Sequence, residues 1–205
     1  GGIDIAALAK YWYGLPSSRN VIVVPKSYEC PWSKMLPVYE AIKLCWEKIQ
    51  PCEIYFFAMN PEAMSWYRLL PASIRDKCHA YERVPRPKVL ETMTQARVML
   101  APSLVDGVPN SLYEAMAAGA FPIVSPIESI KSVVTEDRNV LFARNLYPDE
   151  IADRLQRGEA AREWLATMFP VRMRSKSAHR VSVSATSWRS LNRRNSRSPP
   201  ARQAS

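Results

Sequence analysis

The feature of this sequence that most constrains its fold is the regular alternation of short apolar runs with amphipathic helical patterns. Apolar runs that predict buried strands lie at 21–24, 53–58, 80–84, 98–101, 121–125 and 140–142. Helices are predicted at 33–49, 61–70, 88–96, 111–118 and 128–134, and from residue 148 onward. Strands that alternate with helices form a parallel sheet covered on both faces. We therefore expect an α/β fold with a Rossmann-like parallel sheet of about six strands and helices on both faces.

The basic residues are concentrated at the C-terminal end of the chain. The 205 residues carry a formal charge of +9, yet residues 1–163 contain 19 basic and 19 acidic side chains. The other nine basic residues lie between Arg172 and Arg202, in a segment rich in serine and arginine. Such a segment buries too little apolar surface to offset its ordering entropy, so we expect 166–205 to be a disordered basic tail. A shifted reading frame in the gene would also produce such a tail.

Composition limits the other classes of protein. An apolar content of 47% is typical of a globular chain, and apolar runs such as 54–59 are too short to cross a bilayer. The four cysteines, at positions 30, 45, 52 and 78, form no CxxC pair, which fits a reduced compartment. No charged and apolar leader opens the sequence. We expect a cytoplasmic protein, and peripheral contact of the full-length protein with a membrane stays open.

The segment PSLVDGVPNSLYEAMAAG (102–119) lies between an apolar strand and an alanine-rich helix. In open α/β sheets, ligands bind beyond the carboxyl ends of the strands, where such loops lead into helices. We predict a turn at Asp106 and Gly107, a helix capped by Asn110, and a helix end at Gly119. The amides expected to be free are those of Ser111, Leu112 and Tyr113. Free amides and the helix dipole attract an anion such as phosphate.

Two carboxylates, Asp106 and Glu114, flank this predicted group of amides. Glu114 lies one turn into the helix, where it could accept hydrogen bonds from the two vicinal hydroxyls of a ribose. Asp106 could face a second polyol beyond the phosphates. The arrangement suits a ligand built from ribose, diphosphate and sugar. The same residues are also compatible with a plain turn, an ordinary helix cap and a solvated glutamate, so their spacing alone leaves the function open.

Other residues suited to chemistry are expected to have structural roles. His79 is the only histidine before the basic tail, and a lone histidine is most often structural. Packing is the expected role of the tryptophans Trp12, Trp32, Trp46 and Trp66. The sequence contains no Ser-His-Asp set, no His-rich cluster and no DxD metal motif, so we expect no protein nucleophile and no metal.

The segment APSLVDGVPNSLYEAMAAGAFPIVSP (101–126) resembles the signature of retaining glycosyltransferases with two Rossmann-like domains, the GT-B architecture of family 4 or group 1. In that family, two acidic residues with seven positions between them lead into an EAMA-x-G run; the first is usually Glu and is Asp106 here. Weaker resemblance extends to RPKVLETMTQARVMLAPS (86–103) and NVLFARNLYPDEIADRL (139–155). The opening GGIDIAAL resembles the family's interdomain linker.

The resemblance implies that this chain is the C-terminal, donor-binding half of a retaining glycosyltransferase of the hexosyltransferase type. Residues 1–20 would be the interdomain linker, 21–165 the nucleotide-sugar-binding domain and 166–205 the tail. The partners implied are a UDP- or GDP-sugar donor and a missing N-terminal acceptor domain, without which the chain would be inactive. No cofactor and no metal are expected.

The resemblance also assigns roles to individual residues. The predicted catalytic residues are Asp106, which would orient the donor sugar, and Lys26 and Lys34, which would neutralise the diphosphate as it leaves. Glu114 would hold the ribose, and the backbone of the loop at Arg83 and Val84 would contact the base. The residues expected to bind substrate are Gly107, Val108, Pro109, Asn110, Ser111, Leu112, Glu114, Arg83 and Val84.

Two other functions stay open on the sequence. A nucleotide-sugar epimerase of related architecture is one, although the EAMA-type helix favours a transferase. The basic tail could instead bind nucleic acid, because clustered arginine supplies sequence-independent affinity for phosphate. The neutral globular part and the lack of an RNA-binding motif disfavour nucleic acid as a partner.

Overall fold

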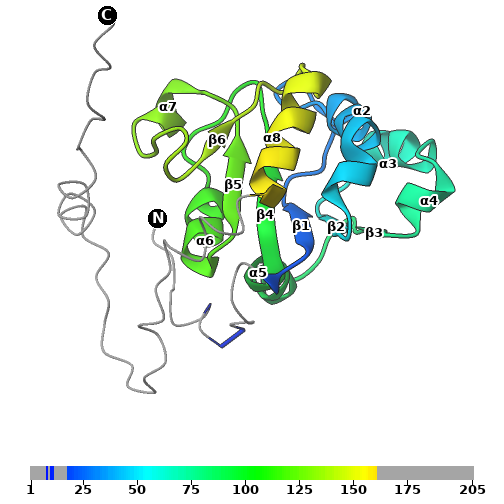
Figure 1. Ribbon diagram of the computed structural model, residues 1–205, viewed down its shortest axis with the longest axis horizontal. Coiled ribbons are helices and arrows are strands. Elements are labelled where there is room, and N and C mark those ends of the chain that lie inside the picture. Colours follow the sequence, from blue (N-terminus) through cyan, green and yellow to red (C-terminus); the bar gives the residue numbers. More distant parts are fainter. Residues whose placement is uncertain (1–7, 9, 12–17, 161–205) are drawn as a thin grey trace, which may run out of the picture. The chain divides into compact units, whose positions relative to one another are not determined.

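The described residues form a single parallel sheet with helices on both faces. The computed structural model describes residues 8, 10, 11 and 18–160. Within them, six strands lie in the order β3-β2-β1-β4-β5-β6, and all pair in parallel (Figure 1). The predicted α/β Rossmann-like fold is therefore confirmed. The predicted tail and most of the predicted linker lie outside the described residues.

The strands and helices alternate along the chain as the sequence predicts. The strands are β1 (Val21–Val24), β2 (Glu53–Phe56), β3 (Cys78–Ala80), β4 (Ala96–Ala101), β5 (Phe121–Val124) and β6 (Leu141–Phe142). The helices are α2 (Leu36–Cys45), the 3-10 helix η2 (Trp46–Ile49), α3 (Pro61–Arg68), α4 (Ala72–Arg75), α5 (Arg86–Gln95), α6 (Asn110–Ala118), α7 (Glu128–Lys131) and α8 (Pro148–Ala160). None of the helices in these ranges is long and apolar enough to cross a membrane.

Several predicted boundaries are wrong. The helix predicted at 33–49 begins at Leu36 and tightens into η2 at Trp46, and the strand predicted at 80–84 is β3, at Cys78–Ala80. The short helix α4 is absent from the prediction. The helix predicted to end at residue 96 ends at Gln95, because Ala96 and Arg97 already belong to β4. A charged residue such as Arg97 reads as a boundary in sequence, yet here it lies buried inside the strand.

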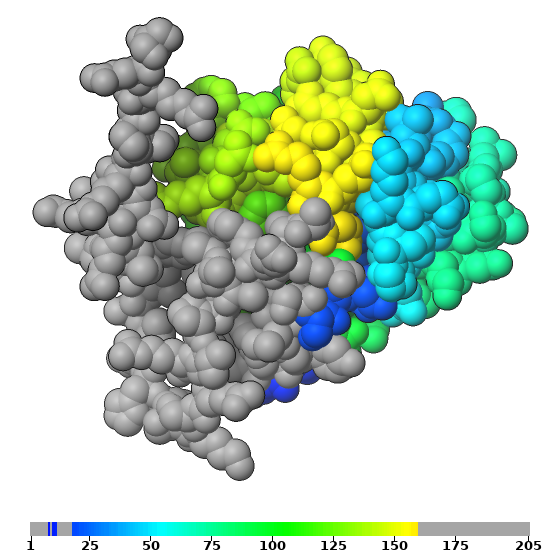
Figure 2. Space-filling model, in the orientation of Figure 1, coloured from blue at the N-terminus to red at the C-terminus, as the bar shows by residue number. Residues whose placement is uncertain are grey.

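Each face of the sheet has its own apolar core. On one face, side chains of α2, α3, α4 and α8 pack on residues such as Ile22, Ile54 and Val98. On the other face, side chains of α5, α6 and α7 pack on residues such as Val23 and Met99. Helices α2 (light blue) and α8 (yellow) lie side by side on the first face (Figure 1, Figure 2). The central strands β1, β4 and β5 are buried on both sides, which accounts for their apolar runs.

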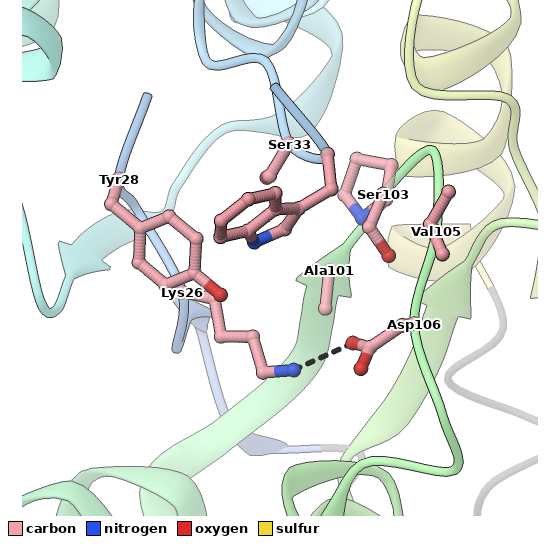
Figure 3. Close-up of a pocket in the computed structure, with 9 residues that line it drawn as sticks. Lys26, Tyr28, Ser33, Ala101, Ser103, Val105 and Asp106 are labelled. Carbon is pink, nitrogen blue, oxygen red and sulfur yellow. Dashed lines mark hydrogen bonds and ion pairs between the residues drawn. The ribbon is translucent and has the colours of Figure 1, made fainter. Parts of the chain in front are cut away.

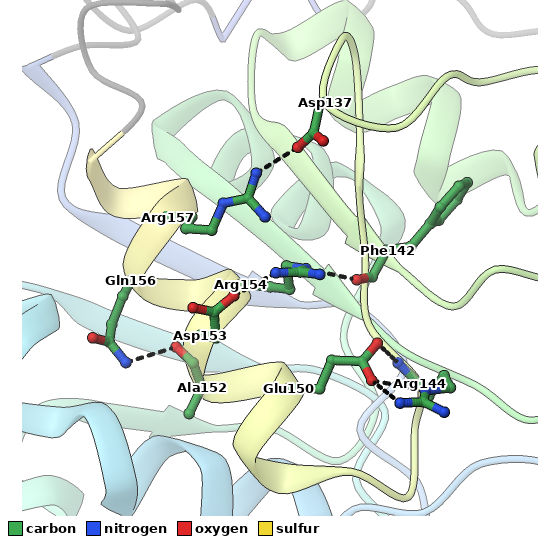
Figure 4. A network of polar contacts seen from close by, with 9 residues as sticks. All are labelled: Asp137, Phe142, Arg144, Glu150, Ala152, Asp153, Arg154, Gln156 and Arg157. Atoms are coloured by element: carbon green, nitrogen blue, oxygen red, sulfur yellow. Dashed lines mark hydrogen bonds and ion pairs between the residues drawn. The ribbon is translucent and has the colours of Figure 1, made fainter.

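Helix α8 packs closely on the sheet and is also tied to the loops around it. A Cβ atom on Gly158 would lie 3.2 Å from both Ile123 Cδ1 and Val98 Cγ2, so only glycine leaves α8 its full approach to the sheet. On the outer side of the helix, Arg157 pairs with Asp137 at 2.5 Å, and Arg154 donates to the Phe142 carbonyl at 3.0 Å (Figure 4). These contacts fix the last described helix against β6.

The strand order switches at β1: β2 and β3 lie on one side of β1, and β4, β5 and β6 lie on the other. At this point the crossovers that follow β1 and β4 leave the sheet on opposite faces, since α2 packs on one face and α6 on the other. The loops after these two strands therefore separate above the sheet and leave a crevice between them. The predicted site segment 102–119 follows β4 and lies at this crevice.

Candidate functional site

The loops that follow β1 and β4 meet at the carboxyl edge of the sheet and line a pocket there. The amide of Leu104 donates to the carbonyl of Trp32 at 2.8 Å, which ties the two loops together. The pocket is small and opens to solvent (Figure 3). Its lining residues are Lys26, Tyr28, Trp32, Ser33, Ala101, Pro102, Ser103, Val105 and Asp106.

An ion pair between Lys26 and Asp106 crosses this pocket. Lys26 Nζ lies 2.5 Å from Asp106 Oδ2, and both side chains are partly exposed (Figure 3). The Asp106 carbonyl also accepts a hydrogen bond of 2.9 Å from Ser129 Oγ, which anchors the loop from the α7 side. The structure thus brings together two of the three residues predicted as catalytic, although they are 80 positions apart in sequence.

The third predicted residue, Lys34, contacts a different carboxylate. Its ammonium lies 2.9 Å from Glu29 Oε1, and this hydrogen bond raises the pKa of Lys34. The side chain of Asn145 accepts from the Lys34 amide at 3.0 Å and donates to its carbonyl at 3.1 Å. Asn145 also donates to the Pro102 carbonyl at 3.0 Å, so it joins three loops at the carboxyl edge of the sheet. Lys34 is absent from the pocket lining.

Helix α6 begins differently from the prediction. Its N-cap is Pro109, and no side chain caps the helix, so the predicted cap at Asn110 is wrong. The backbone bends at Leu104 and Val105 rather than at Asp106 and Gly107. Leu112 is fully buried and its amide donates to the Pro109 carbonyl at 3.0 Å, so the expected free amide there is also wrong.

The start of α6 nevertheless keeps unpartnered donors. In the described part of the chain, the amides of Asn110 and Ser111 make no hydrogen bond, and Ser111 Oγ is buried without a partner. The first turn of α6 carries no acidic residue that would neutralise the helix dipole. Unsatisfied amides together with an uncompensated dipole form a binding site for an anion. Gly119, in the left-handed conformation with φ of 78°, ends the helix as predicted.

Glu114 is buried and paired, which excludes the reading of a solvated glutamate. Only 6% of it is exposed, and Oε1 accepts a hydrogen bond from the guanidinium of Arg86, the first residue of α5. Within the described residues, Oε2 makes no hydrogen bond. Arg86 is mostly exposed and is absent from the sequence prediction, because its partner lies 28 positions away on the neighbouring helix. The pair leaves one carboxylate oxygen of Glu114 available to a ligand.

The remaining predicted residues lie in loops near these pairs. Arg83 is exposed and Val84 packs against the core, and both precede Arg86 in the loop between β3 and α5. Gly107 is exposed, and a Cβ atom there would meet nothing within 4 Å, so no packing requires glycine. Val108 packs partly on the core. The positions of these four residues are compatible with contact to a ligand, but no single one of them identifies a ligand site.

Three residues of the site are missing from the sequence prediction: Glu29, Arg86 and Asn145. Arg86 and Asn145 act through partners far away in sequence, whereas Glu29 pairs with Lys34 and Met35 nearby and carries no motif that marks it. The cations Lys26, Lys34 and Arg86 each face one carboxylate, so the charges of these three pairs cancel. Burial raises the pKa of the Cys45 and Cys52 thiols to about 12, so these two are not nucleophiles at neutral pH. No three His, Cys, Asp or Glu side chains gather as metal ligands within the ranges that the structure describes.

Solved structures share this fold. The C-terminal domain of a group 1 glycosyl transferase (LpcC) from Francisella tularensis is 13% identical with a TM-score of 0.58, covering 82% of this chain and 97% of that one. HepE from Anabaena, in complex with UDP and glucose, is 14% identical with a TM-score of 0.56, covering 83% and 52%. A putative UDP-N-acetylglucosamine 2-epimerase from Listeria monocytogenes is 13% identical with a TM-score of 0.61, covering 80% and 45%. At such identities the likeness shows the fold alone.

The sequence match is to one family. No curated protein sequence matches the chain. The family model for group 1 glycosyl transferases matches residues 19–158, which contain the whole sheet and every residue of the site described above. This match favours the transferase over the epimerase alternative. The chain belongs to the group 1 glycosyl transferases.

Proposed function

We propose that this domain binds the nucleoside diphosphate sugar donor of a retaining hexosyltransferase. The observation that carries the proposal is the uncapped start of α6, with Glu114 one turn further on and the Lys26–Asp106 pair across the neighbouring pocket. The anion site at the helix start suits the diphosphate, and the buried carboxylate suits the ribose. The partly exposed ion pair lies where the sugar would bind.

The diphosphate is bound at the start of α6. The amides of Asn110 and Ser111 supply hydrogen-bond donors and the positive end of the helix dipole. Lys26 is close to this loop, and a bound diphosphate competes with Asp106 for its ammonium. Preorganised donors and a cation at the leaving diphosphate stabilise the negative charge that develops during transfer. While its ammonium stays paired with Glu29, Lys34 contributes only long-range positive charge at the diphosphate.

The ribose is bound by Glu114. Arg86 holds Oε1, so the carboxylate keeps a fixed orientation and presents Oε2 to a ribose hydroxyl. The backbone at Arg83 and Val84, just before α5, contacts the base. Backbone contacts of this kind suit either uracil or guanine, so the donor is a UDP- or GDP-sugar. HepE, which shares this fold, was solved with UDP and glucose.

The sugar lies toward Asp106. Once Lys26 turns to the diphosphate, the Asp106 carboxylate is available to accept hydrogen bonds from sugar hydroxyls and orient the ring. It acts as an orienting group and not as a nucleophile, which fits retention by displacement on one face of the sugar. Neither a metal nor another cofactor is required, because amides and lysines meet the diphosphate. We place the full-length enzyme in the cytoplasm.

The direct test is the affinity of Glu114→Ala for UDP and GDP. Loss of hydrogen bonds to a charged group should weaken binding by about 1.5 to 3 kcal/mol, measured by titration calorimetry in the presence of EDTA. Glu128→Ala is the matched control, because Glu128 is an exposed carboxylate of α7 that pairs with Lys131 on the same helix. Unchanged affinity in a folded Glu114→Ala variant would show that the ribose binds elsewhere. A strict need for Mg²⁺ or Mn²⁺ would contradict the metal-free site.

A further inference from the structure

The sequence predicts a packing role for Trp32, but its side chain does not lie in the core. It is 52% exposed and borders the pocket that contains Lys26 and Asp106. It occupies the tip of a tight turn, in which the amide of Cys30 donates to the Ser33 carbonyl at 2.9 Å and the amide of Ser33 donates back at 3.2 Å. A large aromatic side chain contributes most to stability when it is buried. An indole left half in solvent, at the edge of a pocket, is therefore available to a ligand.

The turn that carries Trp32 is held in place by groups other than the indole. Glu29 is buried before the turn, and its Oε2 accepts the Met35 amide at 2.7 Å on the far side. The side chain of Asn60 accepts from the Glu29 amide at 2.9 Å and donates to the Glu29 carbonyl at 2.8 Å. The loop after β4 adds the bond from Leu104 to the Trp32 carbonyl. The indole is thus positioned in advance, which lowers the entropy lost when a ligand binds.

Apolar side chains and one charged pair surround the indole of Trp32. The half-buried Tyr28 and the exposed Val105 also line the pocket, and Lys26 and Asp106 meet beneath the Tyr28 ring (Figure 3). A pocket of aromatic surface with a few fixed polar groups selects a ligand that has both an apolar face and polar edges. A pyranose ring has this character, because its axial C–H bonds form an apolar face and its hydroxyls project from the rim.

We propose that Trp32 is a sugar-stacking residue of this enzyme. The pyranose lies with its C–H face against the indole, while its hydroxyls donate to Asp106. The inference rests on the proposed function, since it places a sugar beside the diphosphate site. The sugar is either that of the donor or that of an acceptor glycoside, and the stacking chemistry is the same for both.

The test compares three variants of this chain by titration calorimetry. Trp32→Ala removes the ring, Trp32→Phe keeps an aromatic face, and Trp66→Ala removes another partly exposed tryptophan, on α3, which does not line the pocket. The ligands are UDP and GDP, then UDP-glucose, UDP-N-acetylglucosamine and GDP-mannose, then maltose and cellobiose with saturating nucleoside diphosphate. Circular dichroism verifies that each variant is folded.

We expect Trp32→Ala to lose about tenfold in affinity for sugar-bearing ligands, as for loss of one aromatic stacking contact. Affinity for UDP or GDP should not change, Trp32→Phe should keep most of the binding, and Trp66→Ala all of it. A loss confined to nucleotide sugars identifies the donor sugar, and a loss confined to the disaccharides identifies the acceptor.

Two results separate the inference from the proposed function. Equal affinities of wild type and Trp32→Ala for every sugar-bearing ligand would overturn the stacking role, as would a wild type that binds none of them, even if UDP or GDP still binds. Failure of wild type to bind any nucleoside diphosphate would overturn the proposed function. Maltose and cellobiose would then be titrated without nucleotide, and their affinities for wild type and Trp32→Ala would decide the role of Trp32.

Discussion

Replacing Arg97 by methionine is expected to lower the free energy of unfolding by about 3 to 5 kcal/mol, the range for removal of one partner from a buried ion pair. Arg97 lies in β4 and Glu159 in α8, with only 2% and 6% of their surfaces exposed. The guanidinium donates to Glu159 Oε2 and joins the helix to the sheet beside Gly158. Methionine fills similar volume but leaves Glu159 buried without this cation. Urea denaturation with linear extrapolation measures the difference.

Two further variants identify the cause of this loss. Arg157→Met removes an ion pair from the outer side of the same helix, where the partners Arg157 and Asp137 are 43% and 64% exposed, and should cost less than about 1 kcal/mol (Figure 4). The double variant Arg97→Met with Glu159→Leu should regain most of the stability, because it removes the buried carboxylate together with its buried cation. A stable Arg97→Met variant, or a double variant as unstable as the single one, would contradict this account of the pair.

The chain alone is expected to bind nucleoside diphosphate without measurable sugar transfer. The site described here contacts the donor from one side, and we propose that a second domain supplies the acceptor site. Alignment of acceptor with donor and exclusion of water can lower the barrier by about 7 to 11 kcal/mol, which is a rate factor beyond the range of ordinary assays when it is lost. A radiolabelled nucleotide sugar incubated with the chain and candidate acceptors measures the transfer.

A longer gene product that contains the acceptor domain is the matched comparison for this experiment. It should transfer sugar, and Glu114→Ala in it should lower kcat/KM by the same factor as it lowers donor affinity in the shorter chain. Steady turnover by the 205-residue chain alone would show that the acceptor site lies within it.

Local sequence patterns predict most of the fold because the central strands β1, β4 and β5 are buried on both faces. Val21–Val24 and Phe121–Val124 read as apolar runs and are strands. The predicted start of β4 is wrong because Arg97 looks like a polar boundary, whereas in the fold it is buried and pairs with Glu159, 62 positions later. A local reason applies to the start of α6: the cap expected at Asn110 is absent because Pro109 precedes it and takes the N-cap position.

The candidate site could be predicted only where its residues share one segment. Asp106 and Glu114 stand on a single loop and helix, so their spacing carries information. Their partners Lys26 and Arg86 come from other elements, 80 and 28 positions away in sequence. The periodicity of a sequence indicates which faces of its helices and strands are apolar. It does not indicate polar contacts between residues that are far apart in sequence.

The most direct test of the donor site is a titration of the isotopically labelled chain with UDP or GDP, followed through its backbone amide NMR signals. The account predicts that the largest shifts fall on the amides of Asn110 and Ser111 and on the residues around Lys26 and Glu114, at the carboxyl edge of the sheet. Shifts confined to other surfaces, such as α4 or the exposed side of α8, or no shifts at millimolar nucleotide, would contradict it.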